Sequence, residues 1–416
     1  MSICKRRMHW AAIAVLSLGG YSPVIRGATL IVGAPNTTCP NATFTTIGAA
    51  ITAAQAGDVI QICPALYPEQ LTITKPLTLT GIKADGVGRV LLQPTALTVN
   101  TEGFIAVISV ISTSNVTISN LAIDASANTV TACTPVLAGI NFYNASGVVE
   151  DAAISGTGLS TPTDCTTLFP GNGFGVAADQ ATGAAGPFNV TVENSSFHNF
   201  GTDAVIVNGA AESANVSNNS ITGIGPSTGV NQFGVFLAEG ATGQVVGNYI
   251  TQGNCGAISI PNCVSLRSEG VVLRAVGDGV VVANNVISNV QAGVFVNGAT
   301  YPQVIGNTVT SVDAVDGIHI QGSVSGFYAG NRITNVGPFS ATTASDERGC
   351  GLNDVSGSGS SGNYMMANSV SDAYCGVGYV STDFVEANIF LNVLYLTLND
   401  DNYPTGFPPA TEPGQM

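Results

Sequence analysis

Four side chains of this sequence have the chemistry for acid–base catalysis: Asp203, Glu269, Asp316 and His319. Each of the three acids stands immediately before a short apolar phrase that begins with alanine or glycine. Two carboxyl groups about 6.5 to 9.5 Å apart can hydrolyse a glycosidic bond with inversion, because one protonates the leaving group while the other activates water. A histidine can accept a proton near neutral pH. An acid before glycine is also ordinary turn chemistry, so a structural role stays open.

The phrases that follow these acids alternate between apolar and variable residues. Alternation with a period of two predicts strands that bury one face. Clear examples begin at Gly139, Gly234, Gly270, Gly293, Gly317 and Gly376. The chain therefore repeats one kind of strand many times.

A second phrase, asparagine followed two residues later by an apolar residue, recurs between these strands. It occurs at Asn219, Asn248, Asn285, Asn307, Asn331, Asn368 and Asn388, with successive gaps of 29, 37, 22, 24, 37 and 20 residues. The shortest repeats leave no room for a strand–helix–strand crossover. We therefore expect a parallel β-solenoid whose coils stack at about 4.8 Å, with the asparagine amides bonded in a ladder.

The composition fits an all-β protein made of many short strands. Of 416 residues, 50 are glycine and only 9% are charged, which suits tight turns and buried strand faces. A solenoid grows in one dimension, so a single one can use the whole length. We expect it over residues 29–398, followed by a loose tail over residues 399–416.

Residues 1–28 have the pattern of a secretion signal. Three basic residues at positions 5–7 precede an apolar stretch over residues 11–18, and small residues follow at Gly27 and Ala28. The stretch is too short to span a bilayer. We expect a secreted protein, extracellular or, in a Gram-negative host, periplasmic, without membrane insertion.

The charge of the chain limits its partners. Removal of the signal leaves 7 basic against 26 acidic residues, a formal net charge of −19 compared with −15 for the whole chain. A field of this sign repels nucleic acid and anionic membrane surfaces, so neither is expected as a partner. We expect a monomer.

Eight cysteines remain after the signal, and an even number in an exported protein favours disulfides over metal binding. Cys350 and Cys375 each precede the glycine that opens a strand, in neighbouring coils, so their backbones should lie within disulfide range. Pairing of sequence neighbours would join Cys39 to Cys63, Cys133 to Cys165, Cys255 to Cys263 and Cys350 to Cys375. Eight cysteines permit many other connectivities.

Residues 39–81 differ from the coils and form an expected N-terminal cap. A threonine start and alanine-rich apolar periodicity over residues 45–54 predict a short amphipathic helix, which ends at Gly57. Short strands are expected over residues 59–63, 71–73 and 77–81. A helix over the open end of the first coil would protect its exposed strand edge.

This opening resembles that of the pectin-lyase-like right-handed parallel β-helix proteins, especially pectinesterase-type and NosD-type members. The resemblance rests on residues 44–47, 65–73 and 75–81, with Ala65 where that group has glycine. It implies a single-stranded right-handed parallel β-helix with a short N-terminal capping helix. It also implies a secreted class that acts on or binds carbohydrate.

The catalytic phrases of that superfamily are matched only in part. No phrase here resembles the glutamine, aspartate and arginine set of pectinesterases, or the calcium-binding acids and basic residue of the lyases. Gly201-Thr202-Asp203 is similar to part of a polygalacturonase-like phrase, and Asp316-Gly317 to part of another, but their order along the chain is reversed. If the protein is an enzyme, the resemblance implies a polysaccharide-acting glycoside hydrolase or lyase.

Alignment of the glycine-led phrases predicts a surface. With glycine as position one, positions two and four point inward, and positions three and five face outward. Position three includes Phe236 and Phe295, and position five includes Arg274, Asn297 and Gln321. Aromatic rings can stack on sugars and amides can bond hydroxyls. The two phenylalanines can instead pack beneath loops, and Arg274 can belong to an exposed salt-bridge group.

We therefore expect a secreted β-helix that binds a polysaccharide or glycan in a lateral groove, and that cleaves it if the four acid–base residues are catalytic. The alternative is a non-catalytic surface or interaction protein without carbohydrate chemistry. No cofactor is expected. Asp313 and Asp316 could bind calcium together with loop carbonyls, but acid spacing alone is weak support for such a site.

Overall fold

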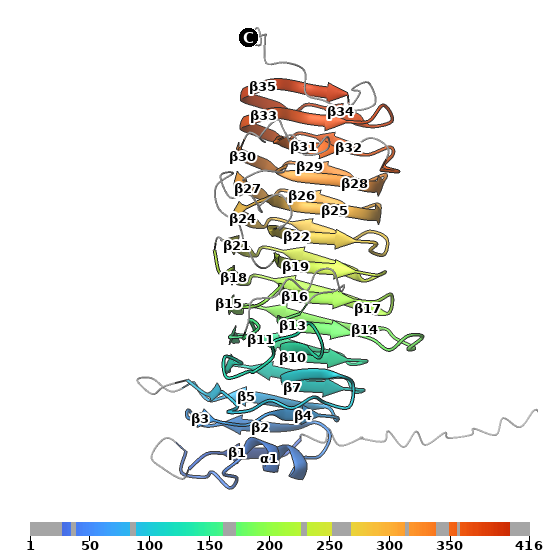
Figure 1. Cartoon of the computed structure of the whole chain (residues 1–416). Helices are drawn as coiled ribbons and strands as arrows, with labels where there is room; N and C mark the ends of the chain where they lie inside the picture. Colours follow the sequence, from blue (N-terminus) through green and yellow to red (C-terminus); the bar gives the residue numbers. More distant parts are fainter. Residues whose placement is uncertain are drawn as a thin grey trace, which may run out of the picture.

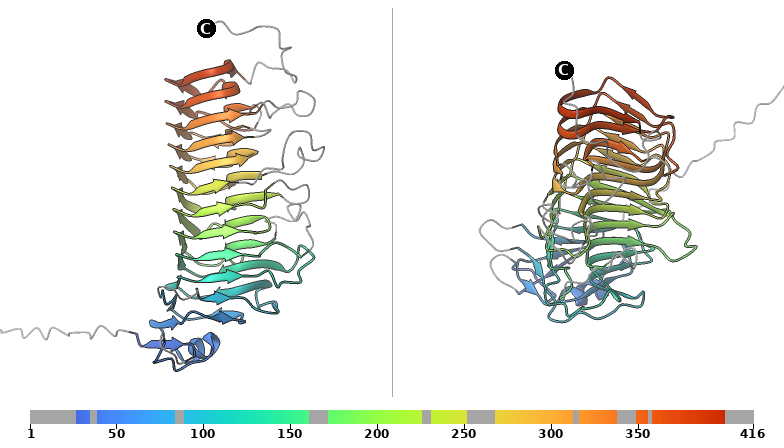
Figure 2. Two further views of the ribbon diagram at one scale, coloured as in Figure 1. Left: turned by 90° about the vertical axis from the view of Figure 1, so that its left-hand side faces the viewer. Right: turned by 45° about the horizontal axis from the view of Figure 1, so that its top comes forward.

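The chain is a single-stranded right-handed parallel β-helix, as the sequence predicted (Figure 1). The computed structural model describes residues 27–34, 39–83, 89–160, 172–225, 231–251, 268–312, 316–337, 349–355 and 358–399. Over most of this length each coil contributes three strands, one to each of three parallel stacks. Figure 2 shows the coils piled along one long axis, with the helix at the N-terminal end.

The first stack is a 13-stranded sheet. Its strands are β1 (Thr29–Val32), β2 (Asp58–Ile62), β5 (Leu77–Gly81), β8 (Val116–Ser119), β11 (Gly147–Glu150), β14 (Phe188–Glu193), β17 (Glu212–Ser217), β20 (Thr242–Val246), β23 (Val281–Ala283), β26 (Gln303–Ile305), β29 (Phe327–Ala329), β32 (Tyr364–Met366) and β34 (Phe384–Glu386).

The second stack, here called the glycine-led ladder, holds most of the strands predicted from the glycine phrases. Its strands are β4 (Leu71–Ile73), β7 (Phe104–Ile111), β10 (Val136–Tyr143), β13 (Phe174–Asp179), β16 (Asp203–Asn208), β19 (Gln232–Ala238), β22 (Ser268–Arg274), β25 (Ala292–Thr300), β28 (Ile318–Val324), β31 (Cys350–Asp354), β33 (Ser369–Tyr379) and β35 (Ile389–Asn399).

The third stack is the short ladder, which β33 and β35 also extend. Its other strands are β3 (Leu66–Tyr67), β6 (Leu91–Leu92), β9 (Ala122–Asp124), β12 (Ala153–Ser155), β15 (Ser196–His198), β18 (Ser220–Thr222), β21 (Tyr249–Thr251), β24 (Val286–Val290), β27 (Thr308–Val312) and β30 (Arg332–Val336).

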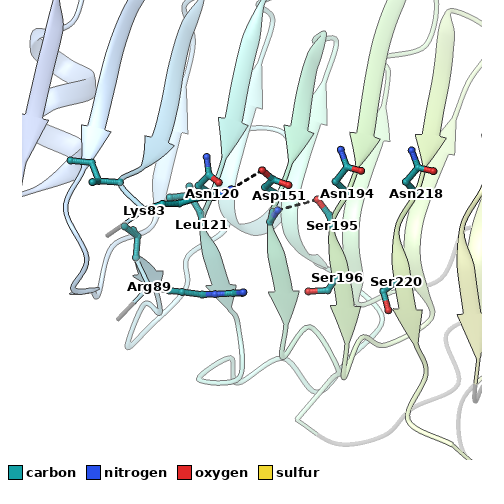
Figure 3. Close-up of a pocket in the computed structure, with 13 residues that line it drawn as sticks. Lys83, Arg89, Asn120, Leu121, Asp151, Asn194, Ser195, Ser196, Asn218 and Ser220 are labelled. Carbon is teal, nitrogen blue, oxygen red and sulfur yellow. Dashed lines mark hydrogen bonds and ion pairs between the residues drawn. The ribbon is translucent and has the colours of Figure 1, made fainter. Parts of the chain in front are cut away.

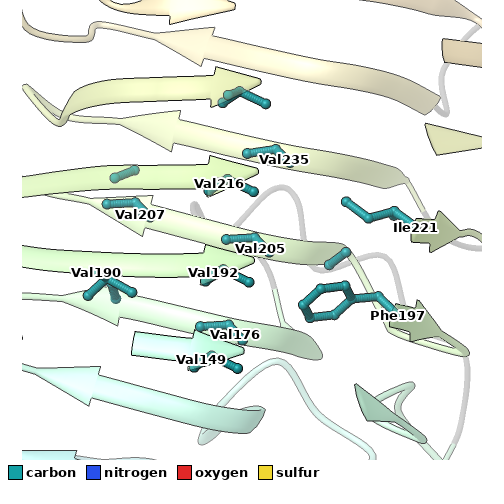
Figure 4. Close-up of a cluster of buried hydrophobic side chains, with 14 of the residues drawn as sticks. Val149, Val176, Val190, Val192, Phe197, Val205, Val207, Val216, Ile221 and Val235 are labelled. Carbon is teal, nitrogen blue, oxygen red and sulfur yellow. The ribbon is translucent and has the colours of Figure 1, made fainter. Parts of the chain in front are cut away.

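Positions two and four of the glycine-led strands point into the core, as predicted. Val235 and Leu237 are fully buried there, among valines, isoleucines and phenylalanines of all three stacks (Figure 4). Glycine leads these strands because the short ladder packs directly against their backbone. A Cβ at Gly234 would lie 2.7 Å from a methyl of Ile250 and 2.5 Å from the carbonyl oxygen of Gly270.

The predicted asparagine ladder is present at the corner between the 13-stranded sheet and the short ladder. Asn285 is fully buried, and its Nδ2 donates to Asn307 Oδ1 at 3.0 Å and to the Val245 carbonyl at 2.9 Å. Its Oδ1 accepts from the backbone N–H and the side-chain amide of Asn248. The same bonds link every step from Asn219 to Asn388.

The N-terminal cap contains the predicted helix, α1 (Ile47–Ala53), which packs against β1, β2 and β4. Thr46 caps its start, and the Glu69 carboxylate accepts from the N–H groups of Ile47 and Gly48. At the other end, Lys75 Nζ donates to two carbonyls of the last turn. A carboxylate at the start and an ammonium at the end of a helix both interact favourably with the helix dipole and so stabilise the helix.

Two of the predicted disulfides are confirmed, Cys39–Cys63 and Cys350–Cys375. Cys133 is also disulfide-bonded. Its predicted partner Cys165, and the predicted pair Cys255 and Cys263, lie outside the described residues.

Several of the remaining sequence predictions concern residues that the structure does not describe. Residues 1–26 of the expected signal, residues 400–416 of the expected tail, and Asp313 all lie outside it. Among the residues described, no helix is long and apolar enough to cross a membrane.

Candidate functional site

The three candidate acids occupy equivalent places on alternate coils of the glycine-led ladder. Asp203 of β16 pairs with Phe233 of β19, which pairs with Glu269 of β22. Glu269 pairs with Ala292, and the register of β25 with β28 places Asp316 opposite Ala292. At about 4.8 Å per coil, neighbouring acids are about 9 to 10 Å apart, and Asp203 is about 19 Å from Asp316.

The outward strip formed by position three of these strands is covered, which corrects the expectation that it faces solvent. Phe236 is 4% exposed and Phe295 is 9% exposed. They belong to a second apolar cluster outside the main core, with Ile206 and Val272 from the same position and Phe233 nearby. Of the two placements that the sequence left open for the phenylalanines, the structure has the packed one.

The acids and the histidine are also buried. Asp203 and Asp316 are fully buried, while Glu269 and His319 are each 4% exposed. Burying an ionisable group is costly unless hydrogen bonds or a change of protonation compensate. The surroundings of each group therefore decide what it can do.

Asp316 and His319 form a hydrogen-bonded pair. His319 Nδ1 lies 2.9 Å from Asp316 Oδ2, which also accepts from Asn353 Nδ2 at 3.1 Å. Asp316 Oδ1 accepts from the backbone N–H of Cys350 at 2.8 Å. The imidazole stacks on the ring of Phe295, with centroids 5.1 Å apart. The carboxylate thus has three donors, and the imidazole is fixed in orientation.

Strand register explains how distant residues build this pair. His319 stands at position three of β28, directly opposite Phe295 of β25 and Asn353 of β31. The Cys350–Cys375 disulfide joins the coil of β31 to the next one. In that next coil Gly378 leaves room for the side chain of Asn353. A Cβ at position 378 would clash with Asn353 Oδ1. Asn353 was not among the residues selected from the sequence, although it occupies position three of the same alternation.

The pair can transfer protons in a defined way. A carboxylate only accepts hydrogen bonds, so the 2.9 Å contact suits the tautomer of His319 that has its hydrogen on Nδ1. The free Nε2 is then the atom that can take a proton from a substrate and later return it. A carboxylate that fixes the tautomer of a histidine also stabilises the imidazolium that forms.

Asp203 has a different environment. Its Oδ2 accepts from the hydroxyl of Thr202 at 2.7 Å, whereas Oδ1 has no hydrogen-bond partner among the residues that the structure describes. Burial raises the pKa of Asp203 well above its usual range, and the Thr202 hydrogen bond only partly opposes this. Burial therefore favours the neutral form of Asp203, and the roughly 19 Å between Asp203 and Asp316 is too long for the two carboxyl groups to act on one glycosidic bond.

Glu269 lies between these two groups, in a small crevice shared with Gln232 and Phe233. Its two-coil distance from Asp316 is close to the upper limit for an inverting carboxyl pair. Among the four candidates, only Glu269 thus has the spacing to act with the Asp316–His319 pair on one bond.

The position-five residues form a polar row beside the covered strip. Arg274 pairs in register with Asn297, and Asn297 with Gln321, on three consecutive coils. Arg274 is exposed, and the two amides are half-buried. Of the five predicted binding residues, these three are the ones that solvent reaches. The structure therefore keeps the expected amides and cation at the surface but not the aromatic platforms.

Metal ligands are not grouped in the described part of the chain. No set of three or more histidine, cysteine, aspartate or glutamate side chains is placed there to hold an ion.

One family model matches part of the sequence, and no curated protein does. The model is described as periplasmic copper-binding protein (NosD) and matches residues 253–350, less than half of the chain.

Solved structures match over most of the chain. A mannuronic acid specific polysaccharide family 6 lyase from human gut microbiota has a TM-score of 0.50 at 11% identity, covering 85% of this chain and 90% of its own. This chain shares with it the fold of a right-handed parallel β-helix. The A-module of a mannuronan C-5 epimerase from Azotobacter vinelandii has a TM-score of 0.48 at 16% identity, covering 82% and 93%. At such identities the likeness concerns the fold of the β-helix alone.

Proposed function

We propose that this β-helix binds a polysaccharide beside the glycine-led ladder and transfers protons on it through the Asp316–His319 pair. The 2.9 Å contact between His319 Nδ1 and Asp316 Oδ2 carries the proposal, because it fixes the imidazole with Nε2 available for chemistry. Arg274, Asn297 and Gln321 form the polar row that would bind sugar hydroxyls or a carboxylate. Glu269 would serve as the second carboxyl group.

The fold is a further support. The β-helix proteins that the chain matches include enzymes named for mannuronan and mannuronic acid polysaccharides. Phrases of the hydrolase kind are matched only in part, so we propose hydrolysis first and elimination second. A proton-transferring histidine serves either reaction.

We also propose that the protein is exported, with residues 1–28 as the signal, residues 29–398 as the β-helix and residues 399–416 as the tail. Two described disulfides support an oxidising compartment, either extracellular or periplasmic. The expected monomer and the expected absence of nucleic-acid partners remain part of this proposal.

A second candidate function is non-catalytic binding of a glycan. The burial of all four acid–base side chains favours it, because a substrate must reach His319 Nε2 and only 4% of that residue is exposed. A binding protein would need only the exposed polar row. Catalysis instead requires that His319 Nε2 become accessible when the polysaccharide binds.

The two candidates separate in one assay. The purified protein is incubated with pectins, alginates and neutral glycans, and new reducing ends, unsaturated products and released methanol are measured. Hydrolysis predicts reducing ends without unsaturated products. If no product forms from any glycan of the panel and the protein is retained on one immobilised glycan, catalysis is contradicted and non-catalytic binding is supported.

Asp316→Asn tests the assigned residue. We expect turnover to fall by roughly 100-fold or more, because the amide no longer holds His319 as a base. The matched control is Asp278→Asn, the same exchange at an exposed residue away from the pair, which should keep full turnover. Far-ultraviolet circular dichroism checks that both variants fold. Unchanged turnover in a folded Asp316→Asn variant would remove the assignment.

A further inference from the structure

A second, open groove lies on a different side of the β-helix. It follows the corner where the 13-stranded sheet turns into the short ladder, over the coils from β5 to β18, and encloses about 480 Å³ (Figure 3). Four steps between coils, at about 4.8 Å each, give it a length of about 19 Å. Such a length can take several sugar rings in a row.

One side of the groove is a row of polar side chains held by an unusual backbone. Asn120, Asp151, Asn194 and Asn218 each have a positive φ between 51° and 56° and follow residues that pair in register. Asparagine and aspartate adopt this left-handed conformation more readily than other residues with a Cβ. Figure 3 shows the four side chains in one line across neighbouring coils.

The other side carries hydroxyl groups. Ser196 of β15 and Ser220 of β18 are exposed and pair in register, so their hydroxyls repeat at the spacing of the coils. One coil further, Tyr249 pairs with Ser220 and is 50% exposed. Amides and hydroxyls can donate to and accept from sugar hydroxyls, and an exposed aromatic ring can stack on a sugar face.

Two cations stand at the N-terminal end of the groove. Lys83 Nζ lies 3.0 Å from Asp151 Oδ2, with both side chains largely in solvent. Arg89 is exposed and has no ion pair with a residue that the structure describes. The whole sequence has only 11 basic residues against 26 acidic ones, so two of them at one groove stand out. An exposed salt bridge of this kind is weak, so a ligand carboxylate can compete for Lys83.

We infer that this groove is a second glycan site, which binds an acidic saccharide with a carboxylate at Lys83 and Arg89 and its hydroxyls along the amides and serines. It goes beyond the proposed function, because it lies away from the glycine-led ladder and, of the described residues that line it, Asp151 is the one carboxylate and none is a histidine. The site anchors a polysaccharide without cleaving it. Neutral saccharides fit less well, since they would make no charged contact with the two cations.

The test uses a uronate hexamer, oligogalacturonate or oligomannuronate, and the same hexamer with its carboxyl groups reduced to alcohols. Calorimetric titration of the whole protein should show binding of the acidic hexamer that weakens with added salt, and at least about tenfold weaker binding of the reduced one. Equal binding of the two hexamers would overturn the assignment of the cations.

Variants locate the site. The double exchange Lys83→Gln and Arg89→Gln should weaken binding of the acidic hexamer by about tenfold or more, and Tyr249→Ala by a few-fold. Arg332→Gln is the matched control, because Arg332 is exposed on the same short ladder but four coils beyond Ser220. It should change binding by less than about twofold. Equal losses in the double variant and the control, or none in either, would overturn the site.

Two further measurements distinguish this groove from the glycine-led ladder and from a simple anion site. Arg274→Gln changes the proposed site on the glycine-led ladder. The affinity of this variant for the acidic hexamer shows how much of the binding occurs at that site and how much at the groove. Inorganic phosphate is tested as a competitor of the acidic hexamer. If phosphate binds the groove as tightly as the hexamer does, the groove is a general anion site and the assignment to a saccharide is contradicted. The outcome does not depend on turnover, since His319→Gln protein can be titrated in the same way.

Discussion

The asparagine ladder and the buried acids of the β-helix both bury polar groups, but only the ladder satisfies them in the same way in every coil. Each ladder amide repeats its neighbour and has partners on both sides at 2.8 to 3.0 Å, as Asn307 does with Asn285, Asn331 and the Val282 carbonyl. The buried acids differ from coil to coil. Among the described residues, one oxygen of Asp203 in the glycine-led ladder and both carboxylate oxygens of Glu212, the first residue of β17 in the 13-stranded sheet, have no hydrogen-bond partner.

This difference separates structural from functional burial of polar groups. A buried amide with every bond made stabilises the stack and gives it register. A buried acid with few bonds costs stability unless a change of its protonation compensates. Buried polar side chains that repeat in every coil therefore belong to the scaffold. Buried polar side chains that differ between coils are the candidates for chemistry.

The largest effect should come from the ladder. Asn307→Ala removes the side-chain acceptor of the buried Asn285 backbone N–H, one of the two bonds of the Asn285 side-chain amide and the side-chain donor to the Val282 carbonyl, so we expect the free energy of unfolding to fall by about 3 to 5 kcal/mol. Denaturant unfolding measures it. The control is Asn284→Gly, the neighbouring exposed residue with φ 55°, where the adjacent coils have Gly247 and Gly306. It should stay within about 0.5 kcal/mol, and an equal loss would break the comparison.

A smaller effect should come from Glu212. Burial, helped by the charge of Asp179, raises the pKa of Glu212 to about 8. Between about pH 4.5 and pH 8 the folded protein keeps the proton that the unfolded chain has lost, so this group makes stability fall as pH rises. Glu212→Gln removes that dependence.

Unfolding free energies at pH 5 and pH 7.5 test this. The variant should gain stability relative to the unmodified protein at pH 7.5 and much less at pH 5. Burial and the nearby charge of Asp383 raise the pKa of Asp354 to about 8 as well, so some dependence on pH should remain in the variant. Parallel pH curves for the two proteins would show that Glu212 has an ordinary environment.

The smallest effect should come from Asp203→Asn. Burial raises the pKa of this side chain and favours its neutral form, so an amide of the same shape is a close replacement and can still accept from Thr202. We expect a change below about 1 kcal/mol at pH 7, measured by denaturant unfolding. If the free energy of unfolding falls several times further, Asp203 is ionised and paired, and its role is structural like that of the ladder asparagines.

Much of the fold could be predicted because its signals are periodic. Glycine-led alternation gave the inward positions, and the spacing of asparagines gave the ladder from Asn219 to Asn388. The register also gave the Cys350–Cys375 pair, since equivalent places on adjacent coils lie within disulfide range. Repetition works here because each coil has the same physical task as the next.

The sites were harder to predict, for two physical reasons. Alternation tells which face a side chain points to, but not what covers that face, so Phe236 and Phe295 could be placed outward and still be buried. The groove at Lys83 and Arg89 combines residues from five coils, and no short motif contains them. Asn353 escaped notice because an asparagine in a chain rich in asparagine carries little information by itself.

The most direct measurement compares His319→Gln with Asn307→Ala for both turnover on the polysaccharide and unfolding free energy. We predict that His319→Gln loses turnover by about 100-fold or more while its stability changes by less than about 1.5 kcal/mol. We predict the reverse for Asn307→Ala, which should lose stability and, while folded, keep its turnover. If turnover follows stability in both variants, the pair at His319 is part of the scaffold and the central claim is contradicted.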